Sequence, residues 1–118
     1  MLPAPYRMRS AADFSATTRR GRRVRAGDLV IYLGRPAESG EPAATKIGLI
    51  VGRAVGGSVV RHQVSRRLRA QLAGLLDQLP TGSRLVVRAL PGAANARSAT
   101  LGQDLEGAVR RLTAGAGR

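Results

Sequence analysis

The chain has 118 residues, a hydrophobic fraction of 43%, an aromatic fraction of 3% and no cysteine, which excludes disulfides and thiolate metal sites and predicts one domain with an aliphatic core. No apolar run approaches the ~20 residues that span a bilayer, and residues 1–10 lack the apolar segment of a secretory signal, so we expect a cytoplasmic protein without a membrane partner. Twenty basic against seven acidic residues give a net charge of +13, an excess that destabilises a compact fold by self-repulsion unless a polyanion is the usual partner.

The first predicted element is a short helix that ends at about Arg20. Ser10 and Asp13 have the S-x-x-D spacing of a capping box, in which a side chain satisfies a free N–H at the helix start. Gly21 is placed to end this helix. A short strand can follow at residues 22–25, and we expect residues 1–9 to form a flexible arm.

Two strands with alternating apolar residues come next, at residues 28–33 and 46–53. The segment between them, residues 34–44, contains proline and glycine and is expected to be a surface loop. Tyr32 should point to the opposite face of its strand from Ile31, because side chains alternate along a strand. The residues expected on one face of each strand are Leu29, Ile31 and Leu33, and Ile47, Leu49 and Val51.

A longer helix is predicted to begin near Ser58, after Gly56 and Gly57 break the strand, and to end before Pro80. Its apolar residues recur at helical spacing and form a stripe roughly 120° wide, taking ~100° per residue. One face of this helix should therefore pack on the core. The stripe consists of Val60, Val64, Leu68, Leu72, Leu75 and Leu79.

A strand at residues 83–90 and a helix from about Ser98 complete the pattern, and we expect residues 113–118 to be a flexible tail. The last helix should bury Leu101, Leu105, Val109 and Leu112. The order of helix, three strands, helix, strand and helix predicts an α+β fold, a small sandwich of one mainly antiparallel sheet of about four strands packed with three helices. Residues 1–118 are expected to form a single RNA-binding domain.

The run at residues 61–69 is the candidate binding surface. Four of its residues fall within roughly 100° of one another on the side away from the core stripe, namely His62, Ser65, Arg66 and Arg69. Arg61 lies in the first turn, where free backbone N–H groups can bind phosphate, and Arg67 projects from the opposite flank. A solvated basic face is the ordinary explanation of such a run, but the next acid on the helix is Asp77, so i,i+4 ion pairs do not explain it. Because guanidinium groups bind phosphate bidentately and stack on bases, we expect RNA to dock here.

Residues 48–69 resemble the signature of the bacterial ribonuclease P protein subunit. These residues contain a predicted strand, the basic residue Arg53, a glycine-rich turn and a predicted helix. The helix opens R-H-Q-V-S-R-R-L-R, where the family has R-N-x-x-K-R-x-x-R. The dipeptide Asp13-Phe14 in the first helix, Tyr32 on the following strand and the later strand with its Pro-Gly extend the resemblance over nearly the whole chain.

The resemblance implies a protein subunit of an endoribonuclease whose catalytic RNA removes the 5′ leader from precursor tRNA, with Mg²⁺ bound mainly by the RNA. It implies ribonuclease P RNA and precursor tRNA as partners, and no DNA. The residues that would dock on RNA are Arg53, Arg61, His62, Ser65, Arg66, Arg67 and Arg69. The single-stranded leader would lie in a cleft between the sheet and the first helix, at Phe14, Thr18 and Tyr32.

Three of these positions depart from the family's pattern. His62 stands where the family has Asn, Ser65 where it has Lys, and Thr18 where a second aromatic residue is common. Phe14 has an alternative role as an anchor of the first helix on the core, and both roles are compatible. Tyr32 is expected to be partly exposed and to offer a platform for base stacking.

Catalysis by the protein itself is not expected. The chain has one histidine, and its acids are scattered, so the paired groups of general acid–base cleavage and the carboxylate clusters of two-metal hydrolysis are both absent from the sequence pattern. A non-enzymatic RNA-binding protein, of the ribosomal or RNA-chaperone type, is the alternative hypothesis, because composition alone does not separate it from a ribonuclease P subunit.

Overall fold

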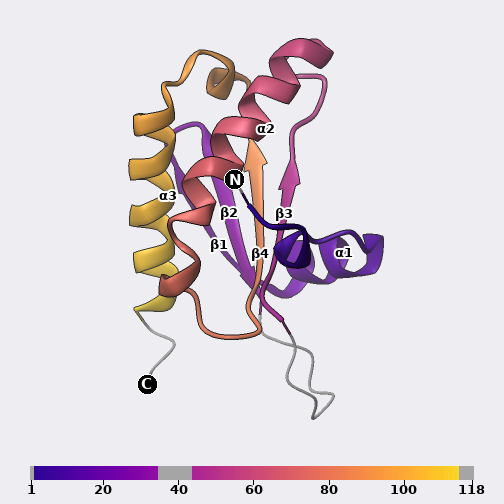
Figure 1. Cartoon of the computed structure of the whole chain (residues 1–118), viewed down its shortest axis with the longest axis vertical. Coiled ribbons are helices and arrows are strands. Elements are labelled where there is room, and N and C mark those ends of the chain that lie inside the picture. Colours follow the sequence, from indigo (N-terminus) through magenta and orange to yellow (C-terminus); the bar gives the residue numbers. More distant parts are fainter. Residues whose placement is uncertain (1, 35–43, 115–118) are drawn as a thin grey trace.

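The computed structural model describes residues 2–34 and 44–114, and Figure 1 shows their arrangement. Its helices are α1 (Ala11–Arg20), α2 (Ser58–Ala73) and α3 (Ser98–Thr113), with short 3-10 helices η1 (Ala4–Tyr6), η2 (Leu76–Gln78) and η3 (Pro91–Asn95). Its strands are β1 (Arg22–Ala26), β2 (Leu29–Gly34), β3 (Lys46–Ile50) and β4 (Arg84–Ala89). The predicted element order and the α+β class are confirmed, while most of the predicted loop at 34–44 and of the tail at 113–118 lies outside the described residues.

The four strands form one sheet in the order β1-β2-β4-β3. The β1–β2 and β2–β4 pairs are antiparallel, whereas β3 and β4 are parallel and are joined through α2. In Figure 1 α2 lies in front of the sheet, both strands run upward and β4 lies to the left of β3, so this crossover is left-handed. About 98% of such crossovers are right-handed, so this handedness is rare. Nothing in the local sequence pattern indicated it.

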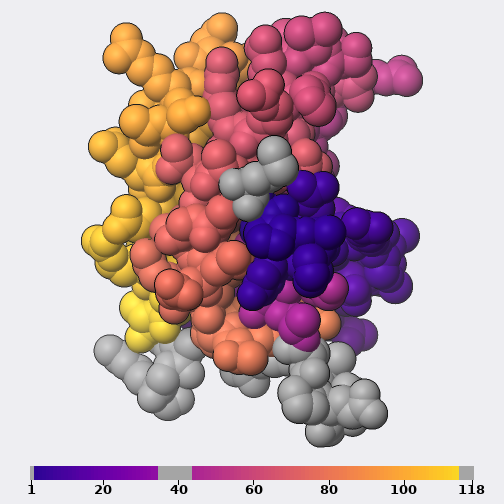
Figure 2. Space-filling model, viewed as in Figure 1, coloured from indigo at the N-terminus to yellow at the C-terminus, as the bar shows by residue number. Residues whose placement is uncertain are grey.

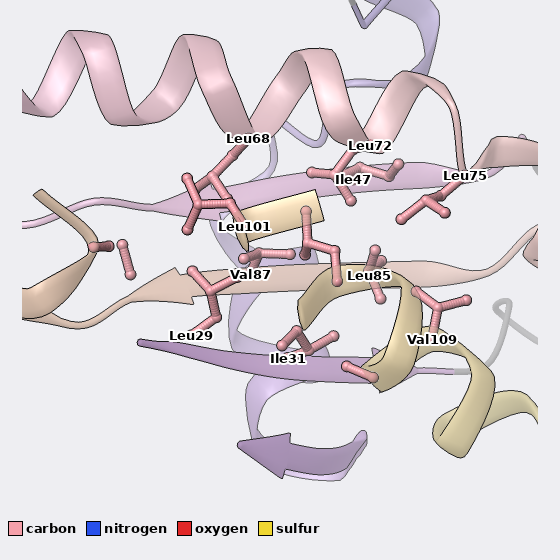
Figure 3. Close-up of a cluster of buried hydrophobic side chains, with 14 of the residues drawn as sticks. Leu29, Ile31, Ile47, Leu68, Leu72, Leu75, Leu85, Val87, Leu101 and Val109 are labelled. Carbon is pink, nitrogen blue, oxygen red and sulfur yellow. The ribbon is translucent and has the colours of Figure 1, made fainter. Parts of the chain in front are cut away.

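The sheet carries helices on both faces. Helices α2 and α3 pack on one face, where Leu68 and Leu72 of α2 point toward the sheet residues Ile47, Leu85 and Val87 (Figure 3). All four apolar residues predicted for the last helix are buried there. Helix α1 packs on the other face, where a second, smaller cluster forms.

Two elements end earlier than predicted. The strand expected at residues 46–53 stops at Ile50, because the chain turns at once into the bend that precedes α2. The helix expected to continue to Leu79 ends at Ala73, where Gly74 and Leu75 donate to carbonyls three residues back and so tighten the last turn. The stripe still reaches the core, since Leu75 and Leu79 are buried from the turn and η2.

The residues before α1, which we expected to form a flexible arm, pack along the edge of the sheet. Leu2 is 1% exposed, and the Met8 amide donates to the Ile47 carbonyl of β3 at 2.8 Å. The Lys46 ammonium donates to the Pro5 carbonyl at 2.6 Å. Figure 2 shows this segment in indigo lying beside the surface of α2. The arm therefore joins the edge strand β3 to α1 and α2.

Candidate RNA-binding site

The beginning of α2 is shaped by two glycines. Gly56 has φ +156°, and a Cβ there would lie 2.9 Å from the Val60 side chain, so a larger residue would not fit. Gly57 is the N-cap and offers no side-chain hydrogen bond to the first turn. The amide groups of the first turn are therefore left for an external acceptor, and a phosphate suits such a position.

Arg53 and Arg61 lie next to this helix start. Arg53 is exposed in the bend before α2, and its carbonyl accepts a hydrogen bond from the Gly56 amide at 3.2 Å. The Nε atom of Arg61 is buried and has no hydrogen-bond partner among the described residues. A buried donor without an acceptor is costly. A phosphate oxygen that bound at this end of α2 could accept the hydrogen bond that the Arg61 Nε–H lacks.

The outward face of α2 follows the sequence prediction. Val64 and Leu68 are fully buried, whereas His62 and Arg66 are exposed and Ser65 and Arg69 are half-buried. We call the following residues the α2 surface: Arg53, Arg61, His62, Ser65, Arg66 and Arg69. Its members His62, Ser65, Arg66 and Arg69 share one outward direction because the core stripe fixes the rotation of the helix, and Arg53 and Arg61 lie at the start of the helix.

Arg67 lies on the other flank of α2, as predicted, and has an internal partner. Its Nη1 donates to the Ala96 carbonyl, just before α3, at 3.4 Å. The sequence pattern gave no indication of this partner, because it lies 29 residues away. The contact places Arg67 between α2 and α3, away from the α2 surface.

The second predicted site lies where α1 meets the sheet. Phe14 is half-buried against Met8, Tyr32 and Val86, and a Cβ on Gly48 would lie 2.5 Å from its Cζ atom. The ring of Phe14 therefore rests on the sheet at the one place where β3 has no side chain. Both roles considered for Phe14 fit this position, since one part of the ring anchors α1 and the rest is accessible.

Tyr32 points to the predicted face. The expected partial exposure of its side chain was wrong, because Tyr32 is 8% exposed and packs in the same cluster. The pairing of β2 with β4 brings Val86 beside it, and α1 covers both. The Thr18 hydroxyl donates to the Phe14 carbonyl at 3.0 Å and lies 3.2 Å from the Ser15 carbonyl, so it is engaged within α1.

A hollow of about 290 Å³ joins the two predicted sites. It lies between the N-terminal arm, α1, β3 and α2, and it brings Arg69 of the α2 surface to the same space as Phe14. Sequence reasoning missed the arm residues in its wall, because the arm has no periodic pattern. The lining residues are Leu2, Arg7, Met8, Arg9, Phe14, Ile47, Leu49 and Arg69.

The positive charge is largely unpaired within residues 2–34 and 44–114. There the structure contains one ion pair, between Arg110 and Glu106 at 3.0 Å. In the same ranges no three His, Asp or Glu residues are grouped closely enough to hold a metal ion. Nor does any helix in this part of the chain have the length and apolar character needed to cross a membrane.

Comparisons with known proteins agree with this geometry. A family model described as Ribonuclease P matches residues 2–113. Proteins named ribonuclease P protein component are similar to the chain: one from Mycobacterium sp. (strain KMS) is 49% identical over 94% of this chain and 92% of its own. The one from Mycobacterium avium (strain 104) is 47% identical over 99% of both chains.

Solved structures show the same fold. The ribonuclease P protein of Staphylococcus aureus superimposes with a TM-score of 0.77 at 21% identity, covering 90% of this chain and 94% of its own. The ribonuclease P protein of Thermotoga maritima gives a TM-score of 0.74 at 19% identity, covering 89% and 96%. At these identities the likeness supports the fold, while the relatives in sequence support the family.

Proposed function

The chain belongs to the ribonuclease P protein family, and we propose that its α2 surface docks on the catalytic RNA while the α1 face of its sheet holds the 5′ leader of precursor tRNA. Membership makes it a subunit of ribonuclease P, a ribonucleoprotein of tRNA processing, rather than a ribosomal or RNA-chaperone protein. We also propose a cytoplasmic location, shared with its RNA partners.

The α2 surface is the observation that carries the proposal. Arg53, Arg61, Arg66 and Arg69 place four guanidinium groups on α2 and the bend before it, and within the described residues none of them is paired with an acid. Guanidinium groups are weakly hydrated and bind phosphate oxygens in pairs. His62 and Ser65, which replace the family's usual residues, can still donate hydrogen bonds to phosphate or ribose.

The leader site is proposed at Phe14, Thr18 and Tyr32. Phe14 supplies the accessible aromatic surface, and the buried Tyr32 supports it from the sheet. Beyond α1 the same face of the sheet continues with Val30, Ile50 and the exposed Arg88, which lie in register across three strands. A cation between two apolar side chains suits a single strand, whose bases need apolar contact and whose phosphates need charge.

We propose that cleavage itself is carried by the RNA, with Mg²⁺ bound mainly there. The carboxylates of this chain are scattered along the sequence, and metal-assisted hydrolysis needs them to converge on one point. The protein's share is then to hold substrate and ribozyme in place, which lowers the entropic part of the barrier. DNA is not proposed as a partner.

Reconstitution tests the function. The protein, mixed with its own ribonuclease P RNA and a precursor tRNA at low Mg²⁺, should give correct 5′ processing that neither component gives alone. Low Mg²⁺ makes the reaction depend on the protein, because the arginines then replace counterions between the RNAs. Processing by the RNA that does not change when the protein is added would contradict the subunit role.

Phe14→Leu is expected to weaken binding of leader-bearing precursor about five- to tenfold, with little change for mature tRNA. The substitution keeps an apolar anchor for α1 and removes a stacking surface worth about 1–3 kcal/mol per base. Titration of the assembled ribonucleoprotein with the two tRNAs measures the difference. Tyr6→Leu is the matched control, since Tyr6 is also half-buried but does not line the hollow; equal losses for both tRNAs with Phe14→Leu would remove Phe14 from the leader site.

A further inference from the structure

A second concentration of charge lies far from α2 in the sequence. Residues 19–25 contain five arginines in seven positions, and no acid occurs between Asp13 and Asp28. This segment covers the last turn of α1 and most of β1. The proposed function makes no use of it.

The tertiary structure adds one more arginine to this group and holds part of it in place. Arg111 of α3 donates to the Arg25 carbonyl at 3.2 Å, and Arg22 donates to the Leu112 carbonyl at the end of α3 at 2.8 Å. A cation at a helix C-terminus is favoured by the free carbonyls and the helix dipole. We call these six residues the β1 edge surface: Arg19, Arg20, Arg22, Arg23, Arg25 and Arg111.

Acidic residues do not neutralise this surface. None of its six arginines forms an ion pair with a described acid. Among the acids of α3 and the β1–β2 hairpin, Glu106 is engaged by Arg110, Asp104 lies against the hairpin glycine Gly27, and Asp28 lies against Gly92. All six arginines are exposed to solvent, so the charge faces outward and is available to a polyanion.

The β1 edge surface is separate from the α2 surface. The strand order β1-β2-β4-β3 places β1 and β3 at opposite edges of the sheet, three strand spacings or about 14 Å apart. Arg69 of the α2 surface lines the hollow beside β3, whereas α3 packs on β1. A phosphate backbone bound at one surface therefore does not automatically reach the other.

The chemistry of the β1 edge surface differs from that of the leader site. Its six members are all arginines, and of the chain's three aromatic residues only Tyr32 lies beside it, opposite Arg23 in the β1–β2 pairing, where it is 8% exposed and offers no open ring face. Without an aromatic platform such a surface cannot hold unstacked bases well. Double-helical RNA is instead recognised mainly through its phosphates and 2′-hydroxyls, which arginines can bind from a flat sheet edge.

We propose that the β1 edge surface binds the phosphate backbone of a double-helical segment of the ribonuclease P RNA, so that the protein contacts its RNA subunit on two sides. This inference rests on the proposed function. The resident RNA is favoured over the tRNA because a substrate must leave in every turnover, and six additional arginines on it would slow product release. A permanent partner carries no such cost.

Arg20→Gln and Arg23→Gln, combined, are expected to lower affinity for the RNA subunit about tenfold at 0.15 M salt. The slope of log K against log salt should fall by about 1.8, at ~0.9 per lost phosphate contact on a duplex. Both side chains are exposed and make no hydrogen bond among the described residues, so the thermal unfolding curve should not move. Filter binding to the RNA subunit without tRNA gives the slope, and hydroxyl-radical footprinting should show one duplex segment losing protection.

The matched control is Arg97→Gln, which removes an exposed charge outside both surfaces, compared with Arg23→Gln alone. Equal slopes for Arg23→Gln and Arg97→Gln would overturn the proposal, and so would a double variant that loses affinity for precursor tRNA but not for the RNA subunit. Failure of the proposed function has a different signature, because the unsubstituted protein would then neither bind the RNA subunit nor support processing.

Discussion

Leu68→Ala should lower the free energy of unfolding by about 2–5 kcal/mol, the range measured when a buried leucine leaves a cavity. Leu68 is 0% exposed at the centre of α2 and packs with residues of α3 and the sheet. Because the chain has only three aromatic residues, its core depends on aliphatic side chains of this kind. A domain of this size has about 5–15 kcal/mol in total, so the variant should lose a substantial part of its stability.

Urea unfolding followed by circular dichroism measures this loss. Val59→Ala on the same helix is the matched control, since Val59 is 70% exposed and its truncation should change stability by less than about 0.5 kcal/mol. Similar losses for the two variants would contradict the orientation of α2, and with it the direction assigned to the α2 surface. The same orientation is assumed by the RNA-binding prediction.

Arg66→Ala combined with Arg69→Ala should weaken binding to the RNA subunit by about 10- to 100-fold and reduce the salt slope by about 1.4–1.8, since each lost phosphate contact removes ~0.7–0.9. Both residues belong to the outward face of α2, and neither has a hydrogen-bond partner among the described residues. Affinity measured at several salt concentrations gives both quantities. The processing assay should show a matching loss at low Mg²⁺ and recovery at high Mg²⁺.

Arg67→Ala is the comparison that makes this test specific. It removes one charge from the next position on α2, but from a side chain that donates to Ala96 between α2 and α3. Its effect should fall on stability, by about 0.5–1.5 kcal/mol for the lost hydrogen bond, and less on the salt slope. A slope that falls as much with Arg67→Ala as with Arg66→Ala would show a diffuse response to charge instead of a defined α2 surface.

If the α2 surface and the β1 edge surface both bind the RNA subunit, the RNA contacts the protein on two sides. The α2 surface reaches the β3 side of the sheet through Arg69, and the β1 edge surface lies at the opposite edge, so contacts at both would fix the protein's orientation on the RNA. The proposed leader site is on the α1 face of the same sheet. A fixed orientation there would place the substrate's single strand reproducibly, which is what a positioning subunit has to achieve.

The sequence by itself determined the local elements and their faces. The Ser10 cap appears in the structure, where its side chain accepts from the Asp13 amide at 3.3 Å, and α2 begins at Ser58 as the glycine pair predicts. The alternation in β2 and β3 and the stripe on α2 correctly assigned the core side of each element. These features depend on residues that are close in the sequence, within one or two helical turns or a few strand positions. That is the range over which periodicity and capping act.

Only the tertiary structure decided how these elements meet. It placed β3 parallel to β4 at the sheet edge with a left-handed crossover, folded the N-terminal arm beside β3, and buried Tyr32 under α1. It also joined Arg67 to Ala96 and Arg22 to Leu112, 29 and 90 residues away. Contacts of this range depend on packing among whole elements, and no local pattern specifies them. The arginines of α2 and of residues 19–25 were therefore recognisable in the sequence, whereas the tertiary structure showed that Arg111 of α3 joins the second group and that the two groups lie apart.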